Sequence, residues 1–318
     1  MDTTPNRTEA DAIIDQMKRL GDVRTIVDGK VIGVPKDLQA MALKPFLDLY
    51  RDRPERRVGM QRLDDLASFI AWTMRHMDKA SVLFCQADRE HPSLVAAIDY
   101  HEADGVDAVA DGKARWIQFG AVYPMTLDDR WLAWNEADGK AHTQAEFAAF
   151  LEDHALDLCP FAPSVAAATD KLLPLPTDVQ DFLNLTGGKC GTPQEVIALA
   201  QGLDVAVAQN MVNKVRLQSG EQRLEFAESH TTSKDGTTVT VPPIFLVGIP
   251  VFALNPAIYR LPVRLRYRVD GGRVSWLPTL WRADETIDQA IRDAADKATA
   301  DTGLPTFYGA SPFKSGGQ

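Results

Sequence analysis

The 318-residue sequence lacks the cysteine pattern of a disulfide scaffold or a zinc site. Its three cysteines, Cys85, Cys159 and Cys190, lie far apart and form no C-x-x-C motif. Disulfide-rich domains and structural zinc sites both rely on sets of conserved, closely spaced cysteines. We therefore expect free thiols in a reducing cytoplasm, with Cys85 buried at the end of an apolar run and chemically inert.

Long hydrophobic runs are missing as well. No stretch approaches 18 consecutive apolar residues, and the N-terminus is polar and acidic. A membrane helix needs about 20 apolar residues, and a signal peptide begins with a basic region and an apolar run. We expect a cytoplasmic protein without a membrane partner. A hydrophobic content of 45% and a charged content of 25% are typical of a globular protein with one large or two ordinary domains.

The short motifs that mark common enzymes are absent too. The sequence has no HExxH, no GxSxG, no GxGxxG after a strand and no EF-hand loop. Residues 187–192 come nearest to a phosphate-binding loop. A P-loop, however, needs glycine where Leu183 stands and serine or threonine where Cys190 stands. The sequence thus predicts no cofactor and no metal, and we do not expect a metalloenzyme.

One short stretch nevertheless carries residues suited to catalysis. Asp99, His101 and Glu102 follow an apolar run that begins at Leu94. If that strand continues, Asp99 and His101 point to one face, as a carboxylate and an imidazole would in order to share a metal or a proton. The alternative interpretation is a hydrogen-bonded strand end. The other histidines that could join this group in space are His76, His91 and His154.

The strongest pattern lies in residues 241–282. From 259 to 269, apolar residues alternate with arginines and one proline, and a period of two predicts a half-buried strand. Asp270-Gly271-Gly272 then predicts a tight turn into a second strand that ends near Leu280. The apolar face carries Tyr259, Leu261, Val263, Leu265, Tyr267 and Val269, and the opposite face carries Arg260, Pro262, Arg264, Arg266 and Arg268.

This segment is unusually basic. It contains six arginines, no lysine and one aspartate, a net charge of +5, so the rest of the chain carries −15 of the total of −10. The arginines Arg260, Arg264, Arg266 and Arg268 could bind an anion or an acidic partner. Alternatively, they form a solvated strand face paired with carboxylates such as Glu221, Glu225 and Glu228. Because the whole protein repels DNA, we expect weak, salt-sensitive nucleic-acid binding at most.

The arrangement of turns predicts the fold class. Two-residue turn signals occur at Asp28-Gly29, Asp235-Gly236 and Asp270-Gly271, without regularly alternating strands and helices. We therefore expect an α+β fold with a largely antiparallel, hairpin-rich sheet and packed helices, in as many as two lobes. The predicted division is an α+β lobe over 1–158, a Pro/Gly-rich connection with short helices over 159–202, a β-rich lobe with a closing helix over 203–308, and a flexible tail over 309–318 that Phe313 could anchor.

Helices are predicted from spacing and capping residues. A stripe of Leu63, Leu66, Phe69, Ile70 and Met74 predicts one helix, and Thr126 is expected to begin another that carries Leu127, Trp131 and Trp134. Thr143 with Glu146, and Thr192 with Glu195, have the spacing of capping boxes. The aromatic residues between 114 and 134, including Trp116, are assigned to the core. A last helix over 284–299 has a stripe of Ile287, Ile291, Ala294 and Ala298.

Four stretches resemble the YfdQ-like family of uncharacterised proteins. They are residues 57–76 (RVGMQRLDDLASFIAWTMRH), 93–102 (SLVAAIDYHE), 114–154 with WLAWNEADGKAHTQAEFAAFLEDH, and 241–269 (VPPIFLVGIPVFALNPAIYRLPVRLRYRV). The resemblance implies a phage or prophage protein, often encoded near early recombination or replication genes. It implies no activity, cofactor or catalytic residue.

Three functions are compatible with these features. The favoured one is a non-enzymatic phage or prophage accessory protein that acts through oligomeric protein surfaces, with a phage or host protein as partner and early phage DNA metabolism or recombination as its setting. A self-assembling structural phage protein is the first alternative. A hydrolase or nuclease-like enzyme using Asp99 and His101 is the second. We expect a homo-oligomer, because the aromatic regions and the small-residue helix offer more apolar surface than a single domain needs.

Overall fold

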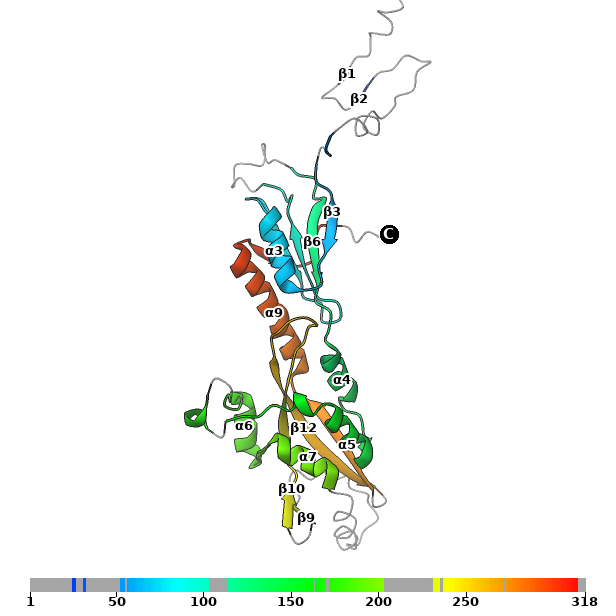
Figure 1. The fold of residues 1–318 in the computed structure, drawn as a ribbon, viewed down its shortest axis with the longest axis vertical. Coiled ribbons are helices and arrows are strands. Elements are labelled where there is room, and N and C mark those ends of the chain that lie inside the picture. Colours follow the sequence, from blue (N-terminus) through cyan, green and yellow to red (C-terminus); the bar gives the residue numbers. More distant parts are fainter. Residues whose placement is uncertain are drawn as a thin grey trace, which may run out of the picture. The chain divides into compact units, whose positions relative to one another are not determined.

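The computed structural model describes residues 52–54, 56–102, 114–162, 164–169, 172–202, 231–234, 237–270 and 273–313, and the strands at 25–26 and 31–32. The chain divides into two compact units, Met1–Arg57 and Val58–Gln318. In the first unit, β1 (Thr25–Ile26) pairs antiparallel with β2 (Val31–Ile32), which confirms the strands predicted on either side of Asp28-Gly29. The second unit contains two five-stranded sheets (Figure 1).

The first sheet combines strands from both ends of the second unit. Its three central strands pair antiparallel, whereas each edge strand runs parallel to its neighbour. The strand order is β14-β4-β5-β6-β3. The bounds are β3 Gly59–Arg62, β4 Val82–Gln86, β5 Ser93–Ala97, β6 Phe119–Pro124 and β14 Thr306–Tyr308.

Helix α3 (Leu66–His76) packs against this sheet. Asp65 caps the helix, since its side chain accepts a hydrogen bond from the Ser68 N–H. The buried residues are Leu66, Phe69, Ile70 and Thr73, whereas Met74 is 50% exposed. The predicted stripe is therefore wrong at its last position, because Thr73, one residue earlier, faces the core instead.

The second sheet has the order β7-β13-β12-β11-β8. Strand β12 (Tyr259–Asp270) lies between β11 (Ile244–Ile249) and β13 (Arg273–Leu280) and runs antiparallel to both, which confirms the predicted hairpin strands. The flanking strands are short: β7 (His142–Thr143) pairs antiparallel with β13, and β8 (Cys190–Gly191) pairs parallel with β11. The helices and the two mixed sheets make an α+β fold, as predicted.

Three helices that follow β6 in the chain begin at residues whose side chains cap them. Helix α4 (Asp129–Ala137) is capped by Asp128 rather than Thr126, and Leu127 forms a bridge with Phe252 before the helix, so the predicted start is too early. Helix α5 (Gln144–Asp153) begins at a capping box of Thr143 and Glu146. Thr192 and Glu195 cap α7 (Pro193–Gly202) in the same way. The remaining short elements are η1 Ala155–Asp157, η2 Val165–Ala167, α6 Thr177–Thr186, β9 Thr231–Lys234 and β10 Thr237–Thr240.

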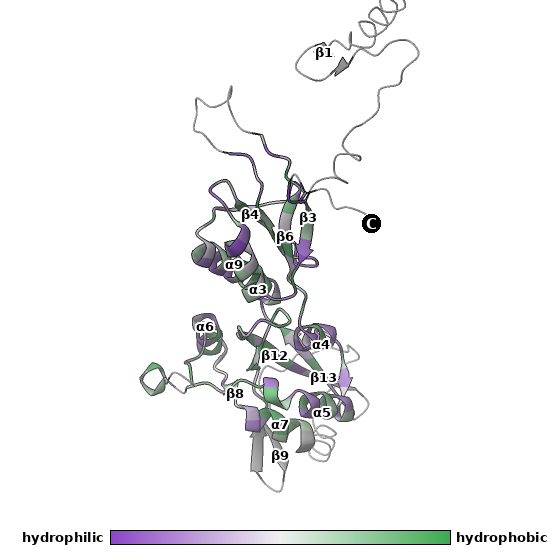
Figure 2. Ribbon diagram, turned by 45° about the horizontal axis from the view of Figure 1, so that its top comes forward, coloured by the Kyte–Doolittle hydropathy of each residue, from purple (hydrophilic) through white to green (hydrophobic). Residues whose placement is uncertain are grey.

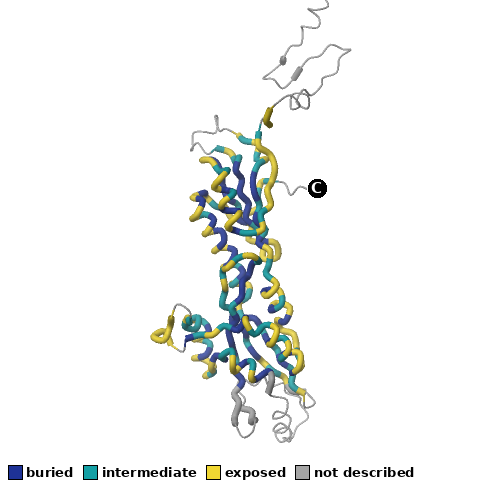
Figure 3. The backbone as a smooth tube through the Cα atoms, in the orientation of Figure 1, coloured by how far each residue is buried: buried dark blue, intermediate teal, exposed yellow. Residues whose placement is uncertain are grey.

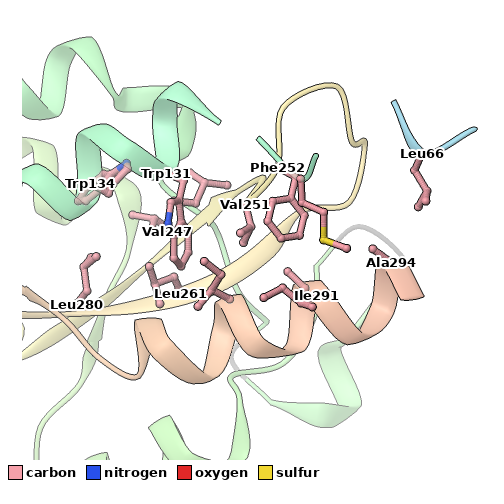
Figure 4. Packing of buried hydrophobic residues seen from close by; sticks show 14 of the residues in the cluster. Leu66, Trp131, Trp134, Val247, Val251, Phe252, Leu261, Leu280, Ile291 and Ala294 are labelled. Carbon is pink, nitrogen blue, oxygen red and sulfur yellow. The ribbon is translucent and has the colours of Figure 1, made fainter. Parts of the chain in front are cut away.

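One hydrophobic core involves both sheets, and helix α9 (Ala283–Thr302) packs against it. The predicted stripe of Ile287, Ile291, Ala294 and Ala298 is buried, and α9 contacts both α3 and β12. In Figure 4, Ile291 lies beside Leu261 of β12, which has no exposed surface. The small side chains of α9 allow its backbone to approach the sheet closely. In Figure 2 the hydrophobic residues gather on the strands, and α9 also displays hydrophilic residues.

The aromatic residues are not all in the core. Trp131 and Trp134 are buried as predicted, and Trp134 donates a hydrogen bond of 2.9 Å to the buried carboxylate of Asp157. Trp116, however, is 69% exposed, so its assignment to the core is wrong. The expected strand is interrupted beside it: Ile117 has a φ of 49°, a left-handed conformation, and β6 begins only at Phe119.

A second, smaller core covers the opposite face of the second sheet. Ile244 and Leu246 of β11 pack there with Val179 and Leu183 of α6. Phe182 of α6 is partly buried and packs against this cluster. The sheet is thus covered on both faces, and the Arg-bearing face of β12 is the one that α6 approaches.

Strand pairing crosses the predicted lobe boundaries in both directions. Strand β7 comes from the predicted N-terminal lobe and joins β13, and β14 comes from the C-terminal lobe and joins β4. The lobe division itself stays a prediction. In the predicted tail, a Cβ atom added to Gly120 would lie 2.9 Å from the ring of Phe313, so this phenylalanine contacts β6 as an anchor. Residues 314–318 lie outside the described residues.

Candidate functional site

Asp99 lies in the turn after β5, because that strand ends at Ala97. Its carboxylate accepts hydrogen bonds from the backbone N–H of Gln118, at 3.0 and 2.9 Å from its two oxygens, and of Phe119, at 3.0 Å. These donors flank the start of β6 and follow the left-handed Ile117. A β-branched residue adopts that conformation at a cost on the order of 1–3 kcal/mol. Asp99 therefore fixes the backbone where β6 begins.

His101 and Glu102 both contact Arg115. The backbone N–H of Arg115 donates to His101 Nδ1 at 3.0 Å, which requires an unprotonated Nδ1. The Arg115 guanidinium donates to Glu102 at 2.8 Å and to Asp78 at 2.5 Å. Hydrogen bonds to Glu102 and Asp78 raise the pKa of Arg115 above its usual value. Burial acts to raise the pKa of Asp78, but hydrogen bonds from Arg115, Ala80 and Ser81 outweigh it, so this pKa is lowered.

This group of residues joins three separate parts of the chain. Asp78 follows α3, Glu102 follows β5, and Arg115 precedes β6. The group lies on either side of residues 103–113, which are outside the described residues. Asp99, His101 and Glu102 thus connect the end of β5 to the start of β6 through hydrogen bonds. This is the arrangement of the hydrogen-bonded strand end considered above.

The other candidate histidines, His76, His154 and His91, lie apart from this group. The ring of His76 lies 4.6 Å from that of Trp72 and 5.6 Å from that of Phe119. His154 stacks on Phe150 at 4.4 Å, with its Nδ1 2.9 Å from the Phe150 carbonyl oxygen. His91 is exposed. Among the described residues, no three side chains of His, Cys, Asp or Glu are grouped so that they could hold a metal ion.

The arginines of β12 share one face of the strand but differ in environment. Arg260 donates from Nη1 to the Pro174 carbonyl at 2.6 Å, and its Nε and Nη2 are buried without a hydrogen-bond partner in the described part of the chain. Arg264 lies over the Phe182 ring, 5.0 Å from the centroid. Arg266 and Arg268, farther along β12, are exposed. The arginine face is thus covered at Arg260 and Arg264 and open farther along the strand.

Two arginines hold α6 against the sheet. Besides Arg264, Arg282 lies over the Trp281 ring at 5.4 Å and has its Nη1 3.7 Å from Asp178. Trp281 in turn packs on Phe182, with 5.3 Å between the ring centroids. The predicted cross-strand carboxylates Glu221, Glu225 and Glu228 lie outside the described residues, so that pairing stays a prediction.

Comparison with protein families supplies an identity at the level of the family. A family model described as "Uncharacterized conserved protein (DUF2303)" matches residues 7–311. The chain belongs to the DUF2303 family. No curated protein and no solved structure matches it. The DUF2303 match covers both sheets, all the candidate residues and the segment that carries α6.

Some relevant residues of this DUF2303 chain were missed by sequence reasoning. Asp78 and Arg115 are 37 positions apart. No motif spacing marks this pair, because residues distant in the sequence are brought together where β5 packs beside β6.

None of the helices in the described part of the chain is long and apolar enough to cross a membrane.

Proposed function

We propose that this DUF2303 protein is a non-enzymatic accessory protein of a phage or prophage that acts through protein surfaces as a homo-oligomer. The proposal rests on the hydrogen-bond partners of the candidate catalytic residues. Asp99 bonds to backbone N–H groups, and His101 and Glu102 bond to Arg115. The phage setting is supported by the resemblance to the YfdQ-like family, with early DNA metabolism or recombination as the process it serves.

The edges of the first sheet are the surfaces proposed for assembly. All four residues of β3 are exposed, as Figure 3 shows, and Phe307 and Tyr308 of β14 are 50% and 55% exposed. An edge strand presents backbone N–H and C=O groups that can pair with another strand. The proposed occupant is a second copy of the chain, because a twofold axis at β3 would place the same row of groups antiparallel to itself.

The strand directions also favour the second candidate, a self-assembling structural protein. Strands β4 and β6 both run antiparallel to β5, and the edge strands β14 and β3 run parallel to β4 and β6. The two edges therefore run in the same direction. Pairing of β14 in one copy with β3 in the next is a head-to-tail contact, which generates a filament, or a ring where the rotation between copies closes, rather than a twofold dimer.

Nucleic-acid binding is expected to be weak in either case. Residues of the 172–186 segment contact Arg260 and Arg264, and the total charge of −10 repels DNA at long range. A role in DNA metabolism would then proceed through a phage or host protein partner.

Sedimentation velocity of edge variants tests the proposal. A lysine on an edge strand disfavours pairing between sheets, so Met60→Lys on β3 should shift the protein toward the 35.0 kDa monomer. Phe307→Lys on β14 should instead dissolve a filament. Leu156→Lys is the matched control, since Leu156 is 99% exposed and lies in η1, away from both edges. If all three variants sediment as the wild type does, the edges do not mediate assembly.

A further inference from the structure

The first sheet has an outer face, which points away from the larger hydrophobic core. Leu83, Ala96 and Ala121 are paired across β4, β5 and β6 and belong to that core. Because successive residues of a strand point to opposite faces, their neighbours in the chain form the outer face. These outer-face residues are Val82 and Phe84 of β4, Val95 and Ala97 of β5, and Gly120 and Val122 of β6. The middle of the outer face is thus apolar.

Much of this outer face is buried. Val82, Val95 and Ala97 are buried, although they belong to neither of the two hydrophobic cores. Phe84 is partly buried, and its ring lies 5.6 Å from that of Tyr100 and 6.0 Å from that of Phe307. A part of the chain outside the two cores therefore covers the face.

Residues 309–313, which we call the strap, cross the outer face after β14. The Gly309 N–H donates to the Cys85 carbonyl of β4 at 2.9 Å, and the Phe313 ring lies at Gly120 of β6. Strand β5 lies between β4 and β6, so these two strands are about 10 Å apart. Four residues span at most roughly 14 Å. The strap therefore passes over β5 with little slack.

The Phe313 ring occupies the place that a side chain at position 120 would take. A Cβ atom on Gly120 would lie 2.9 Å from Cζ and 3.2 Å from Cε2 of the ring, and it would also collide with the Ala96 carbonyl oxygen. Gly120 is paired with Ala97 on one side and with Met60 on the other. The missing side chain thus leaves a notch between Ala97 and Met60, and an aromatic ring fills this notch.

Few contacts hold the strap. Gly309, Ala310 and Pro312 are exposed, and Phe313 is partly buried. Within the described part of the chain, the hydrogen bond given to the strap after Gly309 is internal, from the Phe313 N–H to Ser311 Oγ at 3.1 Å. Terminal segments held in this way open far more readily than core strands do. Opening of the strap uncovers the notch while both sheets stay folded.

We propose that the outer face around Gly120 is a docking site for an extended segment of another protein that carries a phenylalanine, and that the strap is a displaceable occupant of this site. The ring of the incoming segment enters the notch, and its backbone crosses β5 as the strap does. An aromatic anchor fits because the surrounding side chains are apolar and Phe313 already shows the mode of binding. The inference rests on the proposed function only in taking a protein as the partner.

The strap competes with any free segment because it is tethered to β14. A short tether holds Phe313 near the notch at an effective concentration in the millimolar range. A free segment of the same sequence therefore binds the wild type poorly. It binds better to a full-length variant in which the strap lacks its aromatic ring.

The test follows the fluorescence anisotropy of a labelled, amidated peptide with the sequence of the strap, Gly-Ala-Ser-Pro-Phe, as full-length protein is added. Phe313→Ala should bind this peptide roughly tenfold or more tightly than the wild type does. Pro312→Ala is the matched control, since Pro312 is exposed and its variant keeps the ring, and it should behave as the wild type. A peptide with alanine in place of its phenylalanine should bind none of the three proteins.

Photo-crosslinking locates the bound peptide. With a benzophenone in place of the peptide's phenylalanine, cross-links to Phe313→Ala should fall on β6 and on Met60 of β3. The proposal is overturned if the cross-links lie on other elements, if the wild type and Phe313→Ala bind the peptide equally, or if neither binds it. It is also overturned if Phe313→Ala turns an oligomer into a monomer, which would show that the strap is exchanged between copies. Anisotropy does not require an oligomer, so a monomeric wild type would contradict the proposed function and leave this test valid.

Discussion

Arg264 of β12 lies over the ring of Phe182 of α6, with 5.0 Å between its guanidinium carbon and the ring centroid. The face of β12 that the sequence marks as basic is thus partly an internal face. A guanidinium over an aromatic ring contributes about 0.5–2 kcal/mol, depending on how far it is removed from water. This contact connects the stability of the second sheet to the position of α6.

The first prediction concerns this contact. The double replacement Arg264→Gln, Arg266→Gln should lower the free energy of unfolding by about 1–2 kcal/mol, mostly through loss of the Arg264–Phe182 contact. It should leave DNA binding little changed. A denaturant melt beside a DNA titration at two salt concentrations measures both quantities, and Arg268→Gln is an exposed control on the same face.

Strong DNA binding at physiological salt that disappears in a normally stable double variant would identify the arginines as a nucleic-acid site instead. Binding through several phosphates would also weaken steeply as salt increases.

The second prediction concerns the close approach of α9 to the sheets. Ala298 has no exposed surface, so Ala298→Leu should lower the free energy of unfolding by about 1–3 kcal/mol by overpacking the core. Ala300 is exposed on the same helix, and Ala300→Leu should change stability by less than about 0.5 kcal/mol. Chemical denaturation of both variants measures the difference. Equal effects would mean that α9 does not pack as described.

The third prediction concerns Asp99. Asp99→Ala removes the acceptor for the Gln118 and Phe119 N–H groups and should lower stability by about 1–3 kcal/mol. Asp99→Asn retains a carbonyl acceptor and should lose less. Thermal melts compare the two. Near-stoichiometric zinc, iron or manganese in the mildly purified wild type that is lost in Asp99→Ala would show that this residue binds a metal.

The fourth prediction concerns pH. Arg89 binds Asp288 of α9 with two hydrogen bonds of 2.8 and 2.7 Å, and these bonds lower the pKa of the Asp288 carboxyl below 3.8. The resulting stability is present above pH 3.8 and is lost as pH falls through the lowered pKa. Arg89→Gln should therefore be less stable than the wild type at pH 7, and the difference in stability should shrink as the pH falls below 3.8. NMR titration of Asp288 checks this, and an unchanged pKa in the variant would contradict it.

The elements that could be predicted from the sequence are those with local causes. The alternation through Leu261 and Val263 follows from the period of a strand, and the start of α5 follows from the Thr143–Glu146 box. The Ile291 stripe likewise follows from helical spacing. Each depends on residues within a few positions of one another.

The elements that could not be predicted depend on distant partners. The exposure of Trp116 accompanies the left-handed conformation of Ile117, and the residue after it, Gln118, is held by Asp99 from the end of the neighbouring β5. The cover over Arg264 results from α6, about 80 positions away in the chain. The catalytic hypothesis for Asp99 and His101 relied on a longer β5 than the one that forms, since the strand ends at Ala97.

The central claim is that the protein is an oligomer that acts through its surfaces. The molar mass of the wild-type protein tests this claim most directly. Light scattering over a wide concentration range should give twice 35.0 kDa or more, and a mass that grows with concentration would favour open-ended assembly. A single species of 35.0 kDa at every concentration would contradict the proposed function.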